Sequence, residues 1–236
     1  MPRYEVYVGT SGWLYDWNEE LSLDWYVSHS GLNAVELNAS FYRFPFRNQV
    51  LGWARRGRTL RWSVKVHRSI THLRKLGEAS LATWGRFREL FSPMEDLVDF
   101  YLFQMPPSFS CSSENLARVE SFHGKAGLGS RMAVEFRHGS CFTESTARWA
   151  EGAGLTLVSV DSPIATWIAS TGGVVYLRMH GRSSWYAHDY SYGELAEVAR
   201  RIRELSPRRV YVFFNNDHWM LDNARTMLKL LGELIG

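Results

Sequence analysis

Eight short apolar segments recur along this chain at fairly regular spacing, and most of them end in polar residues that alternate with apolar ones. In a β-strand, residues two positions apart point to the same face. Glu36 and Asn38 form one such set, and Ser63, Lys65 and His67 form another. We therefore predict strands that each carry polar groups toward one end. The predicted strands are 5–9, 34–38, 61–67, 100–104, 132–137, 155–161, 174–180 and 210–215.

Segments with helical spacing separate these strands, most clearly at 81–90, 114–122, 143–150, 192–205 and 222–234. Between the sixth and seventh strands, 163–170 has room for a short helix only. Strands that alternate with helices pair in parallel through right-handed crossovers, and eight such units close most naturally into a TIM barrel. We predict a single (β/α)8 domain over 1–236. An open doubly wound sheet is the alternative, although the turn at 9–13 lacks the three-glycine dinucleotide pattern.

The composition agrees with one domain of this size. The chain has 236 residues, of which 45% are hydrophobic, and 27 Lys and Arg stand against 24 Asp and Glu, so the net charge is only +3. A dedicated nucleic-acid binder is usually more basic, so a nucleic-acid partner is left open but not indicated. No apolar run reaches the 18 or so residues of a membrane span, and 1–8 lacks a signal-peptide pattern. We expect a cytoplasmic protein with no membrane partner.

Cys111 and Cys141 are the only cysteines. They have neither the close spacing of a metal-binding pair nor the number needed for a disulfide framework. We therefore expect both to be ordinary free thiols.

Ordered motifs along nearly the whole chain give it a family resemblance. They are Gly-Thr-Ser-Gly-Trp at 9–13, Val-Glu-Leu-Asn at 35–38, Val-Lys at 64–65, Phe-Gln-Met-Pro-Pro at 103–107, Val-Glu-Phe-Arg-His at 134–138, Arg-Met-His-Gly-Arg at 178–182 and Phe-Asn-Asn-Asp at 214–217. With them the chain resembles the YecE-like family. The resemblance implies a TIM barrel and supplies no reaction, because that family has no established function. Cys141 and the pair His218 and Trp219 depart from its usual pattern.

Active sites of TIM barrels form at the carboxyl ends of the strands, where these polar residues fall. The inward-facing acids would be Glu36, Glu135, Asp161 and Asp217, and the inward-facing bases would be Lys65, Arg137 and Arg178. These charges nearly balance. Since an unpaired buried ion costs several kcal/mol, we expect a hydrogen-bonded network.

Four residues are candidates for catalysis. Burial lowers the pKa of a lysine toward neutrality, so Lys65 is a candidate general base or amine nucleophile. The alternative, which we favour, is that carboxylates on neighbouring strands hold it in a structural ion pair. Glu36 and Glu135 are either acids and bases or anchors for a cation. His180 is the strongest candidate among the histidines, because Gly181 lets the backbone approach a ligand closely.

Arginines near the same strand ends suit an anionic ligand. Arg137, Arg178 and Arg182 carry planar guanidinium groups that match carboxylate and phosphate geometry. The alternative is that two of them only neutralise Glu135 and Asp161. The residues expected to bind or orient the substrate are Asn38, Tyr42, His67, Gln104, Arg137, Asp161, Arg178, Arg182, Trp185, Asn215 and Asp217.

A divalent metal is the alternative to a site without cofactors. Glu135, Asp161, His180 and Asp217 lie on the last four predicted strands and offer suitable ligand types. Arg137 and Arg178 would repel a cation there, and the chain has no closely spaced pair of histidines to anchor one. We therefore expect no cofactor.

Three functions follow from these patterns. The first is an enzyme that performs metal-independent acid–base chemistry on a small anionic molecule bearing a phosphate or carboxylate. The second is a metal-dependent phosphodiesterase or nucleic-acid repair enzyme, by analogy with the endonuclease IV-like barrels. The third is a non-catalytic module that binds a ligand or a nucleic acid on its aromatic loops.

Overall fold

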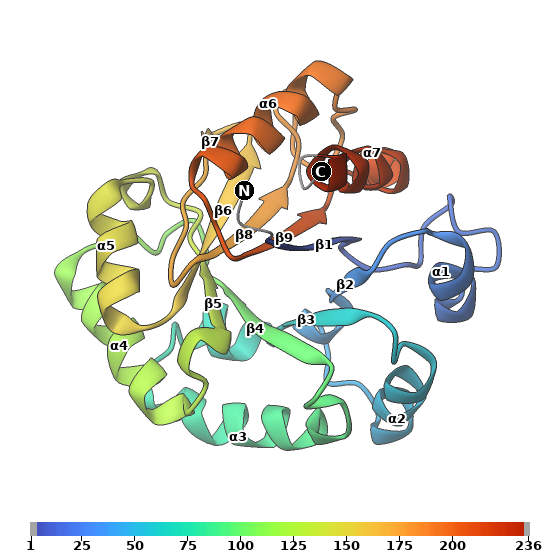
Figure 1. Cartoon of the computed structure of the whole chain (residues 1–236). Helices are drawn as coiled ribbons and strands as arrows, with labels where there is room; N and C mark the ends of the chain where they lie inside the picture. The colour runs from blue at the N-terminus through green and yellow to red at the C-terminus, as the bar shows by residue number, and fades with distance from the viewer. Residues whose placement is uncertain (1–3, 234–236) are drawn as a thin grey trace.

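The fold is a closed barrel of eight parallel strands surrounded by helices (Figure 1). The computed structural model describes residues 4–233. Neighbouring strands follow chain order, and β5 pairs with β6 to complete the circle, so the TIM-barrel prediction is confirmed and an open sheet is excluded. The barrel strands are β1 (Glu5–Thr10), β2 (Ala34–Leu37), β3 (Arg61–Lys65), β4 (Val98–Gln104), β5 (Met132–Glu135), β6 (Thr156–Ser162), β8 (Val174–Met179) and β9 (Arg209–Phe214).

Within residues 4–233, seven α-helices cover the outside of the barrel. Side-chain caps begin several of them: Ser112 and Ser191 each accept a backbone N–H of the first helical turn, and Gly127 and Gly154 end two helices in the left-handed conformation. The five predicted helices are all present. The helices are α1 (Leu23–His29), α2 (Arg47–Arg56), α3 (Leu81–Leu90), α4 (Ser113–Ala126), α5 (Glu144–Ala153), α6 (Tyr192–Glu204) and α7 (Met220–Glu233).

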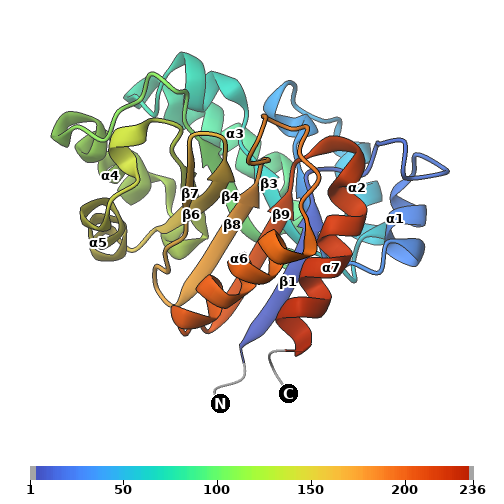
Figure 2. The ribbon, with the colours of Figure 1, turned by 90° about the horizontal axis from the view of Figure 1, so that it is seen from above.

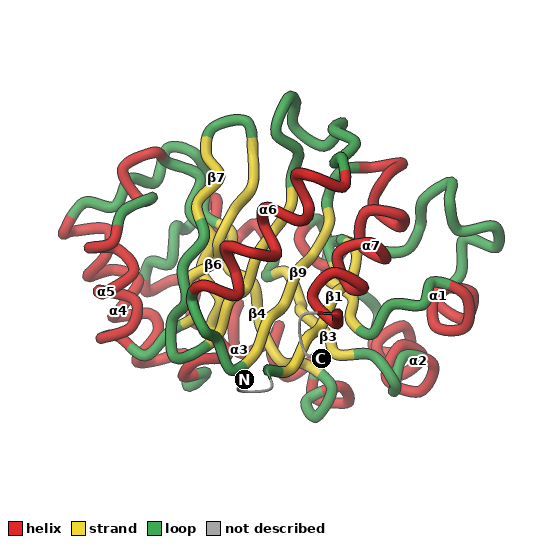
Figure 3. The backbone as a smooth tube through the Cα atoms, turned by 45° about the horizontal axis from the view of Figure 1, so that its top comes forward, coloured by secondary structure: helices red, strands yellow, loops and turns green. Residues whose placement is uncertain are grey.

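The connection between β6 and β8 differs from the prediction. The structure has no helix at 163–170; instead β7 (Ala165–Trp167) folds back antiparallel to β6 and pairs Trp167 with Val160 (Figure 3). Thr166, Trp167 and Ile168 are β-branched or aromatic residues, which favour a strand over a short helix. The prediction of a short helix was wrong because these residues favour a strand over a helix.

Below the polar mouth, apolar side chains pack together inside the barrel. Ala34, Phe100, Leu102, Tyr176 and Phe213 belong to one packed cluster inside it. A larger cluster fills the space between strands and helices. Both described ends of the chain lie at the bottom of the side view, opposite the mouth into which the strands point (Figure 2). Among residues 4–233, every helix is too short or too polar to cross a bilayer.

A disulfide joins Cys111 to Cys141, with a Cα–Cα distance of 5.2 Å. Cys111 lies in the loop after β4, and Cys141 ends a 3-10 turn after β5. Because β4 and β5 are parallel neighbours, their following loops meet at the mouth. The expectation of two free thiols was therefore wrong, since a separation of 30 residues conceals this proximity in the sequence.

Candidate functional site

The polar residues of the strand ends converge at the carboxyl-terminal mouth. β2 ends one residue after Glu36, β3 ends at Lys65, β5 ends at Glu135 and β8 ends one residue after Arg178. At this end, each of these four strands is one or two residues shorter than predicted, because its last polar residues are not part of the regular β-ladder. We call the network of Glu36, Arg178, Glu135, His180 and Arg137 the mouth cluster.

Arg178 is the centre of the mouth cluster. Its Nε lies 3.0 Å from Glu36 Oε2 and its Nη2 lies 2.5 Å from Glu36 Oε1, while its Nη1 lies 2.5 Å from Glu135 Oε2. All three side chains are fully buried. Burial would lower the pKa of Arg178, but the two carboxylates raise it above its ordinary value. Arg178 is therefore a permanent cation that links β8 to β2 and β5.

Glu135 and His180 form the second half of the cluster. Glu135 Oε1 lies 3.0 Å from His180 Nε2 and makes a close ion pair with Arg137 Nε. Burial would raise the pKa of Glu135, yet Arg137 and Arg178 bring it well below its ordinary value. Burial, and after it the charge of Arg137, lowers the pKa of His180 well below its ordinary value. Glu135 is thus ionised and His180 is a neutral imidazole.

Lys65, the last residue of β3, lies in the same mouth. Among residues 4–233 it makes no ion pair within 4.0 Å, so the favoured prediction of a structural ion pair was wrong. Its Nζ lies 4.3 Å from the centre of the Phe41 ring, and the residue is 8% exposed. Burial, together with Arg178, lowers the pKa of Lys65 to about 7, although Glu135 and Glu36 act in the opposite direction. Glu36 and Glu135, the carboxylates that we expected to pair with Lys65, are instead paired with Arg178.

Trp185 covers the arginine side of the mouth. The Arg137 guanidinium carbon lies 4.6 Å from the centre of its ring, and His180 lies 5.6 Å from the same indole. Arg137 Nη2 is also 3.1 Å from His180 Nε2. The loop after β8 therefore shields these charges from water, which strengthens their interactions.

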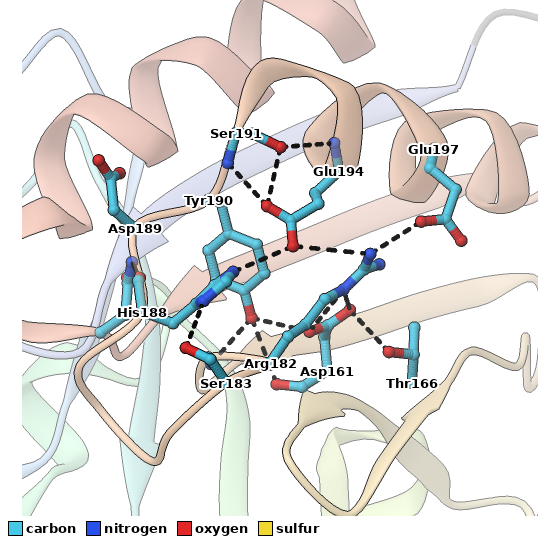
Figure 4. Close-up of polar contacts among 12 residues, drawn as sticks. Asp161, Thr166, Arg182, Ser183, His188, Asp189, Tyr190, Ser191, Glu194 and Glu197 are labelled. Carbon is cyan, nitrogen blue, oxygen red and sulfur yellow. Dashed lines mark hydrogen bonds and ion pairs between the residues drawn. The ribbon is translucent and has the colours of Figure 1, made fainter.

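Asp161 and Arg182 lie outside the mouth cluster, in a second polar network shown in Figure 4. The register of β6 pairs Asp161 with Met179, whereas Val160 pairs with the inward-facing Arg178. Asp161 therefore points away from the barrel interior, where it accepts hydrogen bonds from Arg182 Nε at 3.0 Å and Tyr190 at 2.8 Å. The predicted inward position of Asp161, and the predicted convergence of Arg182 with Arg137 and Arg178, were wrong.

Three other predicted residues also lie away from the cluster. Asp217 is exposed in a 3-10 turn after β9, and Tyr42 is 66% exposed on the rim. His67 lies beyond the end of β3, where its Nδ1 contacts Ser69 and its ring packs against Phe44. A period-two pattern holds only while the backbone stays extended, and these residues follow the end of their strands.

Three amides border the mouth. Asn215 Nδ2 lies 3.2 Å from His180 Nδ1 and so holds the second ring nitrogen. Asn38 contacts the Ser11 carbonyl at 3.4 Å, and Gln104 is half-buried with its Nε2 on the Met105 carbonyl. Of these, only Asn215 is bonded to the mouth cluster directly.

Sequence reasoning missed three partners of Glu36 and Lys65. Tyr176 donates to Glu36 Oε2 at 2.8 Å and lies 2.6 Å from Ser63 Oγ, and Ser11 donates to Glu36 Oε1 at 2.9 Å. Tyr176 stands two residues before Arg178, so the same period-two pattern could have found it. Nothing in the sequence distinguishes Phe41, which lies against Lys65, from other loop aromatics.

The four metal-ligand candidates do not come together. Glu135 and His180 are in contact, but Asp161 faces the outside of the barrel and Asp217 is exposed. Among the residues that the structure describes, no group of three or more His, Cys, Asp or Glu side chains is placed to hold an ion. Glu135 is instead neutralised by two arginines.

Known proteins with similar sequences and structures cover the whole barrel. The chain is 27% identical to the UPF0759 protein YunF of Bacillus subtilis, over 96% of this chain and 94% of that protein. A DUF72 family protein from Thermotoga maritima superposes with a TM-score of 0.83 at 29% identity, covering 97% of this chain and all of that one. A xylose isomerase domain containing protein from Salmonella typhimurium shares the fold alone, with a TM-score of 0.56 at 13% identity over 89% of this chain and 92% of that one.

The Thermotoga maritima protein and a family model give the same assignment. The model described as "Protein of unknown function DUF72" matches residues 7–235. That range includes every strand except the first two residues of β1, and it includes all residues of the mouth cluster. The chain therefore belongs to the DUF72 family.

Proposed function

We propose that the mouth is the active site of an enzyme that performs metal-independent acid–base chemistry on a small anionic substrate. The observation that carries this proposal is Lys65, a buried amine in the mouth with no ion pair among residues 4–233. A pKa of about 7 leaves both of its protonation states populated at neutral pH. A group with this property can take a proton and return it within one catalytic cycle.

The charges around Lys65 favour an anion. Glu36 and Glu135 carry two negative charges, and Arg178 and Arg137 carry two positive charges, so the mouth cluster is neutral by itself. Protonated Lys65 then adds an uncompensated positive charge. A phosphate or carboxylate beside Lys65 would stabilise this ammonium form and raise its pKa, which couples substrate binding to proton uptake.

The cluster residues receive different roles in this proposal. Arg178 has Nε, Nη1 and Nη2 engaged with glutamates, so it is a positioning residue. Glu135 stays ionised and orients His180, whose neutral ring is the second candidate to move a proton. Arg137 and Lys65 are the cations that would contact the anion. Arg182 and Asp161 hold the loop after β8 instead of the substrate.

The proposal is tested with two measurements on the same variants. Lys65→Met removes the amine, and Lys125→Met is the matched control, because Lys125 is an exposed lysine that pairs with Glu78 on the helical side. The chain has only four lysines, so NMR of ¹³C-methylated protein resolves each titration separately. We expect one lysine to titrate near pH 7, and its signal to be absent in Lys65→Met.

The second measurement is a screen of phosphorylated and carboxylated metabolites for thermal stabilisation and for turnover. Binding and turnover that are lost in Lys65→Met and kept in Lys125→Met support the enzyme. Unaltered turnover in Lys65→Met would refute it. Binding that needs Lys65 but yields no product would favour the ligand-binding module. Turnover that depends on an added divalent metal would favour the phosphodiesterase.

Two further expectations belong to this proposal. We infer that the YecE-like family and DUF72 are the same family, because the motifs of the first lie within the range matched by the second. We also propose a cytoplasmic location, which cell fractionation tests. The Cys111–Cys141 disulfide makes that test informative, because disulfides are uncommon in the cytosol.

A further inference from the structure

An apolar cavity of about 270 Å³ lies beside the mouth cluster. Its walls come from the loop after β1, the turn after β2 and the helix α2. Trp13 and Trp53 are buried there, with their rings 6.0 Å apart in an edge-to-face arrangement. The other lining residues are Ser11, Gly12, Leu14, Tyr15, Leu37, Asn38, Ala39, Ser40, Arg43, Pro45 and Gln49.

Three lining residues connect this cavity to the charged site. Ser11 lines the cavity and donates to Glu36. Ser40 donates to the backbone carbonyl of Lys65 at 2.7 Å. Tyr15 also lines the cavity, and its hydroxyl lies 3.4 Å from the backbone carbonyl of Ser11. One molecule in the mouth could therefore reach both places.

The size and chemistry of the cavity limit what can occupy it. A buried apolar cavity of about 150 Å³ is enough to bind benzene. A cavity of about 270 Å³ therefore has room for a bicyclic ring. Tryptophan rings pack favourably against other aromatic rings. Leu14 is 64% exposed at this site, an uncovered apolar side chain that such a ring would cover.

We propose that this cavity is the subsite for a planar, two-ring aromatic group of the substrate, whose anionic end lies at Lys65. This inference rests on the proposed function for the anionic end only. Lys65 is on β3, and the cavity lies at the loops after β2 and β1. Parallel strands are about 4.8 Å apart, so a ligand that reaches from Lys65 to these loops spans roughly 5 to 10 Å. Arg43, exposed at the cavity and without an ion pair among residues 4–233, adds a second cation for a negatively charged linker.

The test uses ligands that separate the two ends. 2-Naphthol probes the ring subsite, inorganic phosphate probes the anion site, and naphthyl phosphates with spacers of different methylene number probe both. Dissociation constants come from calorimetry or ligand-observed NMR on the whole chain. Trp53→Ala removes one wall. Ala39→Trp fills the cavity from an exposed position and leaves the core intact. Trp149→Ala on α5, whose indole bonds Glu120, is the matched control.

We expect 2-naphthol to bind and both cavity variants to weaken it roughly tenfold or more, as the loss of a buried aromatic contact does. Trp149→Ala and Lys65→Met should leave that binding unchanged. One linked compound should bind more tightly than either half. No naphthol binding, naphthol binding that Ala39→Trp does not alter, or no gain from any linker would overturn this inference. Phosphate binding that Lys65→Met does not weaken would overturn the proposed function instead, with naphthol binding intact.

Discussion

Arg178 on β8 and Glu36 on β2 meet in a two-point ion pair inside the barrel, with Nε–Oε2 and Nη2–Oε1 distances of 3.0 and 2.5 Å. Both side chains are fully buried. The same guanidinium holds Glu135 on β5, so one cation joins three strands that are far apart in the sequence. With both glutamates held by Arg178, Lys65 makes no ion pair within 4.0 Å among residues 4–233.

Removal of the Arg178 cation should destabilise the fold strongly. Arg178→Met leaves Glu36 and Glu135 buried with less compensation, and breaking a buried ion pair in this way costs about 3 to 5 kcal/mol of unfolding free energy. Urea unfolding at pH 7 measures the loss. Arg148→Met, which breaks an exposed pair with Glu144, is the control and should cost at most about 1 kcal/mol. Equal losses of unfolding free energy in the two variants would show that the mouth cluster contributes little to the stability of the fold.

The unfolding free energy should depend on the titration of Lys65. The pKa of Lys65 is about 7 in the folded protein and 10.5 in the unfolded chain. Between these two pH values the unfolded chain therefore binds more protons than the folded protein. Stability therefore rises with pH through that window, by at most about 1.4 kcal/mol per pH unit. The Lys65→Met variant lacks this pH dependence, so its unfolding free energy should exceed that of the wild type by the largest amount near pH 7.

Urea titrations from pH 7 to 10 of wild type, Lys65→Met and Lys125→Met test this sign. The difference between wild type and Lys65→Met should shrink as the pH rises, while Lys125→Met follows the wild type. A difference that stays constant with pH would mean that Lys65 keeps an ordinary pKa.

Metal removal should leave the protein unchanged. Glu135 is engaged by Arg137, Arg178 and His180, and no other acid faces it from the predicted ligand set. We expect elemental mass spectrometry of protein purified without chelator to find well under one equivalent of zinc, manganese or iron, and EDTA to leave the melting temperature unaltered. One equivalent that disappears in the Glu135→Gln, His180→Ala variant would reverse this expectation.

The disulfide should add to stability. It closes a loop of about 30 residues, for which chain entropy predicts roughly 3 to 4 kcal/mol. The Cys111→Ser, Cys141→Ser variant should unfold at lower urea concentration by that amount, and reductant should bring the wild type to the same value. Alkylation of either cysteine in unreduced, denatured protein would show instead that the thiols are free.

The sequence predicted the fold well because its signals are local. Apolar segments such as 174–180 and 210–215 stand next to strong helical patterns such as 192–205, and alternation of this kind has few closed solutions. It also placed Glu36, Glu135, Arg137, Arg178 and His180 at one end of the barrel, because period two within a strand assigns each side chain to a face. The sequence-based prediction failed at 163–170, because the segment is long enough for a short helix while its residues favour a strand.

Only the tertiary structure decided which charges pair. Asp161 has the same local pattern as Arg178, yet the register of β6 turns it outward, and a shift of one residue reverses every face of a strand. The guanidinium of Arg178 reaches Glu36 and Glu135 at once, which an ammonium cannot do with the same geometry. The sequence by itself determined a barrel with a charged mouth. The packing of that mouth left Lys65 without an ion pair among residues 4–233 and brought Cys111 to Cys141, because both depend on distances between strands that no local pattern encodes.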